Sequence, residues 1–221
     1  MNSDQARLTD PHLRTPRAAA FAGILFSVLL FLALGLLRLS VPGDPLEPGT
    51  WLESGLSYVT LAMNLVPFAG VAFLWFVGVL RDRLGPREDQ FFATVFLGSG
   101  LLLLAMLFTA AAVVHAIILA FHAAPESLEH SATFHFARGL AYGMMNTYLV
   151  KTASVFMITT STIALYTRLT PRWLAIGGYV IAIILLIGSY YLDWSLMVFP
   201  YWVLCVSVFI LWDKEAAPDS T

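Results

Sequence analysis

The segment from His115 to Lys151 holds most of the side chains in this chain that could bind a metal, a proton or an anion. It contains four of the five histidines, two glutamates, an arginine and a lysine, set between two strongly apolar stretches. Imidazole nitrogens and carboxylate oxygens are suitable ligands for zinc, iron, manganese or copper. The candidate ligands of such a divalent metal are His115, His122, Glu126, Glu129, His130 and His135.

Two interpretations of this histidine and glutamate cluster stay open. His115 and His122 are seven residues apart, so they share one side of a helix. No spacing in the cluster matches a strong metal motif such as His-Glu-x-x-His. The cluster is therefore either the site of a membrane-embedded metal-dependent or redox enzyme, or an ordinary polar loop outside the membrane.

A second set of polar residues follows one predicted helix face. Glu53, Ser57, Thr60 and Asn64 are spaced by four, three and four residues, and Pro67 continues the same face. A proline within a helix frees one backbone carbonyl, which beside an asparagine could bind a cation or a polar solute. The alternative is a packing seam, in which Ser, Thr and Asn donate hydrogen bonds to another helix.

Lys151 is the charged residue that a membrane helix accommodates least easily. Insertion of a lysine at the helix centre costs about 2.5–3.5 kcal/mol. Lys151 lies 17 residues before Arg168, which is roughly 25 Å along a helix and near the outer boundary. It must therefore pair with a carboxylate, face water, or extend toward the outer headgroups. Glu53 and Asp193 are the candidate partners.

These intramembrane polar residues are concentrated at one depth on different helices. This clustering predicts a polar vestibule open to the outside, as in a small transporter, channel or solute-binding protein. The predicted lining is Glu53, Ser57, Thr60, Asn64, His115, Lys151, Ser154 and Asp193. A structural or assembly subunit of a membrane complex is a further hypothesis, in which the polar stripes are helix–helix seams.

The composition indicates an integral membrane protein. The chain has 221 residues, of which 59% are hydrophobic and 12% charged, whereas soluble domains are about 45–50% apolar and about 25% charged. The net charge of -2 does not indicate a nucleic-acid partner. Cys205 is the only cysteine, which excludes an intrachain disulfide. The expected partners are the lipid bilayer and a small solute or ion, and a homo-oligomer stays open.

The apolar segments predict an all-α fold with one polytopic transmembrane domain over residues 18–212. About 20 apolar residues cross a bilayer core of roughly 30 Å, and the first segment is too long for a signal peptide. The six predicted spans are about 18–37, 51–80, 91–121, 140–167, 173–192 and 195–212. Residues 1–17 and 213–221 are expected to be polar cytoplasmic ends.

The basic residues in short loops predict the orientation. With six spans, one side carries Arg7, Arg14, Arg17, Arg81, Arg83, Arg87, Arg168, Arg172 and Lys214. The other side has only Arg38 and Arg138, together with most of the acidic residues near the spans. Both termini are therefore expected in the cytoplasm.

Two short stretches resemble pieces of uncharacterised bacterial six-helix membrane proteins. They are Arg-Ala-Ala-Ala-Phe-Ala-Gly at residues 17–23 and Pro-Arg-Trp-Leu-Ala at residues 171–175, followed by Gly177 and Gly178. The resemblance covers the first span and the turn into the fifth. It implies a protein of the bacterial inner membrane and no particular activity.

Overall fold

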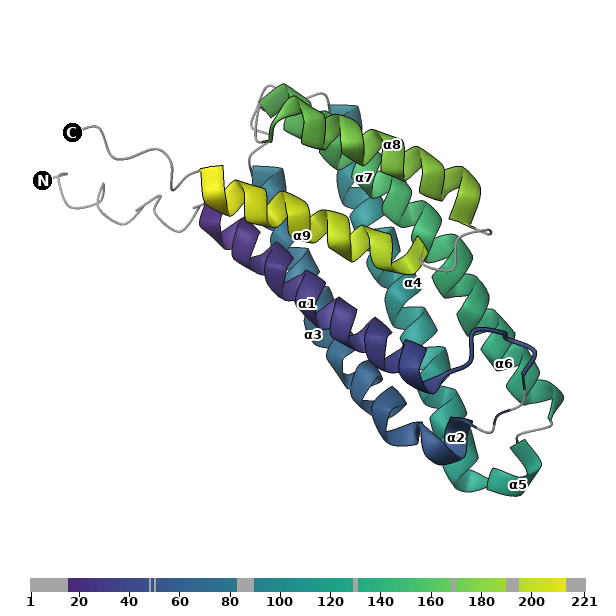
Figure 1. Cartoon of the computed structure of the whole chain (residues 1–221). Coiled ribbons are helices and arrows are strands. Elements are labelled where there is room, and N and C mark those ends of the chain that lie inside the picture. Colours follow the sequence, from purple (N-terminus) through teal and green to yellow (C-terminus); the bar gives the residue numbers. More distant parts are fainter. Residues whose placement is uncertain are drawn as a thin grey trace, which may run out of the picture.

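The computed structural model describes residues 16–47, 49, 51–82, 90–128, 131–167, 170–189 and 195–213, and every element in this part of the chain is helical. The all-α fold class is thereby confirmed. The helices are α1 (Pro16–Ser40), α2 (Trp51–Ser54), α3 (Leu56–Asp82), α4 (Gln90–Ala123), α5 (Pro125–Leu128), α6 (Ala132–Gly143), the π-helix η3 (Met144–Leu149), α7 (Val150–Thr167), α8 (Arg172–Gly188) and α9 (Ser195–Asp213). Figure 1 shows their arrangement.

Within the described residues, five segments are long and apolar enough to cross a membrane. They are Ala18–Ser40, Leu56–Arg81, Phe91–Ala123, Ala132–Tyr166 and Ser195–Trp212. The protein is thus a polytopic membrane protein. The apolar helix α8 has 17 residues, or about 26 Å of helix, slightly less than a bilayer core of about 30 Å. The predicted fifth span, about 173–192, and with it the total of six spans, therefore stay predictions, and the expected end of that span at residue 192 lies outside the described residues.

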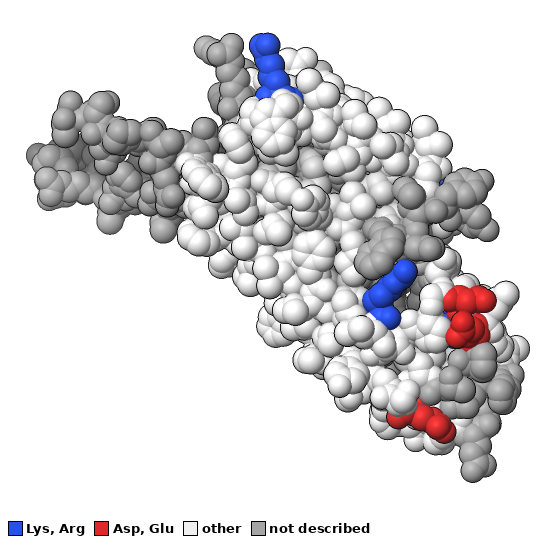
Figure 2. Space-filling view, in the orientation of Figure 1, with Lys and Arg blue, Asp and Glu red and all other residues white. Residues whose placement is uncertain are grey.

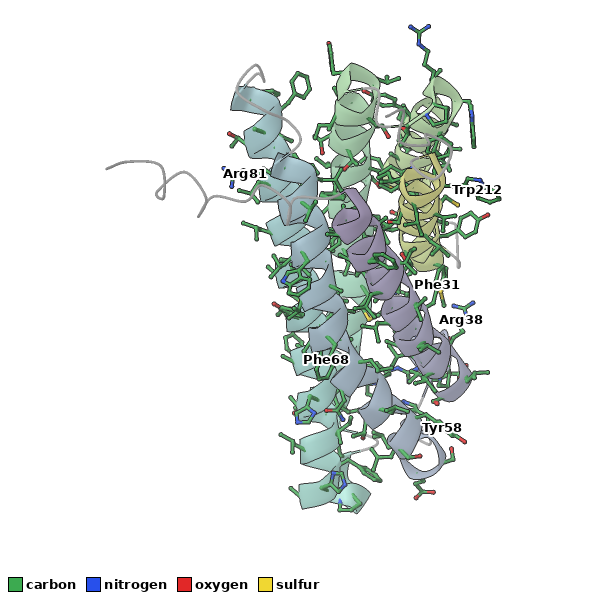
Figure 3. All side chains as sticks on the ribbon, turned by 90° about the vertical axis from the view of Figure 1, so that its left-hand side faces the viewer. Phe31, Arg38, Tyr58, Phe68, Arg81 and Trp212 are labelled. Atoms are coloured by element: carbon green, nitrogen blue, oxygen red, sulfur yellow. The ribbon has the colours of Figure 1, made fainter. Side chains whose placement is uncertain are left out.

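The first turn of α1 and the last turn of α9 lie at the same end of the bundle. α1 packs against both α3 and α9, and the two views agree on this placement (Figures 1 and 3). Figure 3 places Arg81 and Trp212 toward this end and Arg38 and Tyr58 toward the other. We call the end with Arg38 the outer end, after the predicted orientation; the side of the membrane that it faces stays a prediction.

Five phenylalanines from five helices form the centre of the core. The ring centroid of Phe73 on α3 lies 4.8 Å from Phe26 and 5.1 Å from Phe156. Phe156 also stacks on Phe96 at 5.1 Å, and Phe199 of α9 contacts three of these rings. Aromatic pairs of this kind contribute about 0.5–1.5 kcal/mol each beyond the area they bury. The cluster therefore holds α1, α3, α4, α7 and α9 together.

The helix that carries the fourth predicted span begins earlier than expected and contains a wider turn. It starts at Ala132 rather than near Leu140, because the side chain of Ser131 caps it by accepting a hydrogen bond from the Phe134 N–H at 3.1 Å. The chain then stays helical to Thr167, through the π-helical turn η3. Arg138 therefore lies on a helix and not in a loop.

Candidate functional site

A cavity of about 570 Å³ lies near the outer end, within the size range of ligand-binding pockets. We call it the outer cavity. Its polar lining comes from Arg38, Asp44, Arg138, Tyr142, Asn146, Thr147 and Ser189. Its apolar lining includes Leu34, Leu37, Val41, Trp51, Val114, Ile117, Met145, Leu196 and Met197. In Figure 2, acidic and basic side chains lie close together near the loop between α1 and α2, whereas most of this face is uncharged.

Arg138 holds one wall of the outer cavity in place. Its side chain is only 6% exposed, and its guanidinium donates to the carbonyls of Pro42 at 3.1 Å, Asp44 at 2.6 Å and Glu47. The loop after α1 has few hydrogen bonds of its own, such as that from the Leu46 N–H to the Asp44 carboxylate at 2.8 Å. Arg138 thus fixes this loop to α6 through charge-assisted hydrogen bonds.

The π-helical turn η3, which continues the helix that carries Arg138, supplies a further part of the lining. Asn146 and Thr147 both line the cavity, beside Met145, and the Asn146 side-chain amide donates to the Tyr142 carbonyl at 3.2 Å. A π-turn adds a residue to the helical turn and occurs frequently at functional sites. Here it lets three consecutive residues contribute to the same cavity.

Trp51 lines the cavity and carries a buried, unpaired hydrogen-bond donor that does not face the cavity. Its side chain is 5% exposed. Its indole N–H is buried and has no hydrogen-bond acceptor among the described residues. Leaving such a donor unsatisfied costs about 1–3 kcal/mol.

A second, narrower space continues from the floor of the outer cavity into the core. We call it the apolar crevice. Leu34, Leu37, Val114 and Met145 line both spaces. The remaining crevice lining is also apolar and comprises Leu30, Ala33, Met63, Val66, Leu107, Ala110 and Ala111. The crevice has a volume of about 10 Å³, room for about one water, and it offers that water no polar side chain.

Three of the predicted vestibule residues bond to their own helices. The Thr60 hydroxyl donates to the Leu56 carbonyl at 2.8 Å, and the Asn64 amide donates to the Thr60 carbonyl at 3.0 Å. Ser154 is fully buried and donates to the Val150 carbonyl at 2.8 Å. These contacts satisfy polar groups within a membrane helix and need no neighbouring helix.

The other vestibule candidates are exposed or lie outside the described residues. Glu53, Ser57, His115 and Lys151 are exposed, and the structure does not describe Asp193. Within the described ranges, no carboxylate lies at ion-pair distance from Lys151. None of the seven described candidates lines the outer cavity. A vestibule built from them stays a prediction, because the cavity at the outer end uses different side chains.

The predicted metal ligands are only partly described. The side chains of Glu126, Glu129 and His130 lie outside the description, and those of His115, His122 and His135 lie within it. A ring nitrogen of His122, Nδ1, hydrogen-bonds the Ile118 carbonyl at 2.8 Å. In the part of the chain that the structure describes, no three His, Cys, Asp or Glu residues form a group that could hold a metal. The divalent metal site stays a prediction.

The signal for the outer cavity was present in the sequence in two places. Arg138 is a charged residue at the edge of a predicted span, and Trp51 follows a turn rich in proline and glycine. Arg138 was predicted only as a basic residue of a loop, and Trp51 was assigned to no site. Neither interpretation considered that the loop after α1 folds back over α6.

No protein family, no curated protein and no solved structure matches this chain. The resemblance to bacterial six-helix membrane proteins therefore stays an expectation. The protein is a helical membrane protein with five candidate spans among its described residues.

Proposed function

We propose that the protein binds a small solute in the outer cavity. The observation that carries this proposal is the cavity of about 570 Å³ itself, whose lining combines several polar side chains with a larger number of apolar ones. Pockets that bind small molecules are mostly apolar and contain a few well-placed polar groups. The outer cavity has this composition, and its opening near the outer end would admit a solute from that side.

The geometry favours a binding site over an open channel. Among the described residues, the space that shares lining residues with the inner part of the cavity is the apolar crevice of about 10 Å³. A pore for ions or polar solutes needs polar groups or water along its length. Solute binding is thus the part of the predicted transporter, channel or solute-binding function that this geometry supports best.

The test compares the small molecules that remain bound to gently purified variants. Thr147→Trp places a large side chain in the cavity lining. Thr109→Trp makes the same change on the exposed outer face of α4 and is the matched control. We expect mass spectrometry of extracts to find a compound retained by the wild type and the control but lost from Thr147→Trp. Identical extracts from all three proteins would overturn the proposal.

A further inference from the structure

We propose that a groove between α8 and α9 binds one anionic phospholipid from the surrounding bilayer. We call it the lipid groove, and we call the end of the bundle with Arg81 and Trp212 the inner end. One acyl chain of the lipid would lie along the groove, with the phosphate of its headgroup beside Arg172. The site goes beyond the proposed function, since it shares no lining residue with the outer cavity.

The lipid groove has the size and the chemistry of a site for a hydrocarbon chain. Its volume is about 600 Å³, within the size range of ligand-binding pockets. The lining includes Trp173 and Leu174 of α8 and Leu204, Val208 and Trp212 of α9, and its described residues carry no charged side chain. An acyl chain fits such a lining through dispersion contacts, because lipid tails and leucine side chains are equally apolar.

The lipid groove begins beside a short contact between α8 and α9. α8 packs mainly against α7 and meets α9 at Gly178, where the indole of Trp202 leaves no room for a side chain. From there the lining continues along α9 from Leu204 to Trp212, which is about 12 Å of helix. Each leaflet contributes roughly 15 Å to a bilayer core of about 30 Å. The groove therefore spans most of the hydrocarbon of one leaflet.

Two exposed tryptophans indicate the level of the headgroups. The side chains of Trp173 and Trp212 line the groove and are 69% and 72% exposed. They lie in the first turn of α8 and the last turn of α9, which Figure 1 shows toward the same end of the bundle. Tryptophan is enriched where the hydrocarbon core meets the headgroups. A lipid whose chain lies in the groove would thus have its headgroup beside these two helix ends.

The charge of Arg172 favours an anionic headgroup. Arg172 is the first residue of α8, directly before Trp173, and its side chain is exposed. Within the described ranges, no carboxylate lies at ion-pair distance from it. Pro171 provides no side-chain cap for the first N–H groups of α8, and a helix N-terminus carries a partial positive charge. Basic sites between membrane helices bind anionic headgroups through such charges.

The charged residues nearby in the sequence do not reverse this balance. They are Arg168 before α8 and Asp213, Lys214 and Glu215 after Trp212, two basic and two acidic residues whose side chains lie outside the description. Together with Arg172, three basic residues stand against two acidic ones. The net formal charge of these residues therefore favours an anionic headgroup over a zwitterionic one.

The experiment measures which phospholipid the full-length protein retains. Nanodiscs contain equal amounts of phosphatidylglycerol and phosphatidylcholine with identical acyl chains, and native mass spectrometry follows release of the protein into a mild detergent. We expect one phosphatidylglycerol to stay bound at least about five times as often as phosphatidylcholine, the preference expected for one arginine near an anionic headgroup. Equal retention of the two lipids would overturn the inference.

Two pairs of variants test the headgroup and the chain separately. Arg172→Gln should remove the preference for phosphatidylglycerol, whereas Arg81→Gln, at an exposed arginine of α3 toward the same end, should keep it. Val208→Trp should fill the groove and abolish lipid retention, whereas Val71→Trp makes the same change at an exposed valine of α3 and should not. A preference that survives either Arg172→Gln or Val208→Trp would place the lipid elsewhere, and the inference would be wrong.

The measured masses also distinguish a lipid from a second copy of the chain. A dimer that contains no lipid and is lost in Val208→Trp would mean that another copy fills the groove, which would overturn the inference. Thr147→Trp, which fills the outer cavity, should retain the same phospholipid as the wild type. Failure of the lipid groove and failure of the solute site are therefore separate results.

Discussion

Arg138 shows how one buried side chain can fix the loop that borders a cavity. A buried guanidinium is tolerated only where its donors are paired, and here the partners are three carbonyls of the loop that closes the outer cavity. Arginine fits this role because its planar fork presents several donors at fixed angles, whereas lysine offers a single point charge. The cavity therefore depends on the shape of Arg138 as well as on its charge.

We expect Arg138→Leu to destabilise the protein by about 2–4 kcal/mol, because three charge-assisted hydrogen bonds are lost together. Arg138→Lys should recover only part of this. Chemical unfolding in detergent measures the change, and faster proteolysis of the loop at residues 41–47 should accompany it. Arg81→Leu, an exposed arginine at the opposite end, is the control. Equal stability of Arg138→Leu and Arg81→Leu would contradict the structural role.

A change at Lys151 distinguishes between the outer cavity and the vestibule predicted from the sequence, because Lys151 belongs only to the predicted vestibule. It is exposed and does not line the outer cavity. We therefore expect Lys151→Met to change stability by no more than about 0.5 kcal/mol and to leave the compound retained in the extracts unchanged. Loss of that compound in Lys151→Met, with retention in Thr147→Trp, would instead support the vestibule predicted from the sequence.

At the scale of elements, close helix contacts depend on individual glycines. A Cβ atom at Gly178 on α8 would collide with the Ser161 hydroxyl of α7 and the indole of Trp202 on α9. A Cβ at Gly23 on α1 would likewise collide with Ser207 of α9. Small residues let membrane helices approach closely, where dispersion contacts and not hydrophobic burial drive association.

We expect Gly178→Ala to destabilise the protein by about 1–3 kcal/mol, the usual cost of overpacking. Gly177→Ala is the matched control, since a Cβ there meets nothing within 4 Å. On helix propensity alone, Gly177→Ala should be neutral or stabilising by up to about 1 kcal/mol. The comparison uses thermal unfolding of the two variants in the same detergent. Similar unfolding temperatures for both would mean that α8 does not pack as described.

At the scale of the whole molecule, the lengths of the helices indicate how deep the outer cavity would lie in a bilayer. α4 has 34 residues, or about 51 Å of helix, whereas α9 has 19, or about 29 Å. Only part of α4 can therefore lie in a bilayer core of about 30 Å. At the outer end, α2, α5 and the beginning of α6 extend past α8 and α9 (Figure 1). We therefore expect the outer cavity to lie near a membrane surface.

The orientation can be tested with single cysteines in a Cys205→Ser background, since the chain has no other cysteine. We expect a membrane-impermeant thiol reagent to label Glu47→Cys in intact cells. Arg81→Cys should react only after the cells are permeabilised. The reverse result would invert the orientation predicted from the basic loops, and labelling of both sites from outside would exclude the arrangement altogether.

The sequence by itself determined the class of protein and the long helices. Hydropathy is a sum over neighbouring residues, so the segments at Ala18–Ser40 and Ser195–Trp212 were predictable to within a few residues. It also predicted that Ser57 and Asn64 share a helix face, and both are exposed. The side to which that face turns was not predictable, because lipid and protein core are both apolar environments for a membrane helix.

Only the tertiary structure decided which polar groups meet. Arg138 contacts Pro42, Asp44 and Glu47 across more than 90 residues of chain, and no local pattern encodes that contact. The π-helical turn that contains Asn146 was also not predictable from the sequence, since it depends on how α6 and α7 pack against α4. Rotation of each helix about its axis is set by its neighbours, and this rotation brings Trp51, Arg38 and η3 to one cavity.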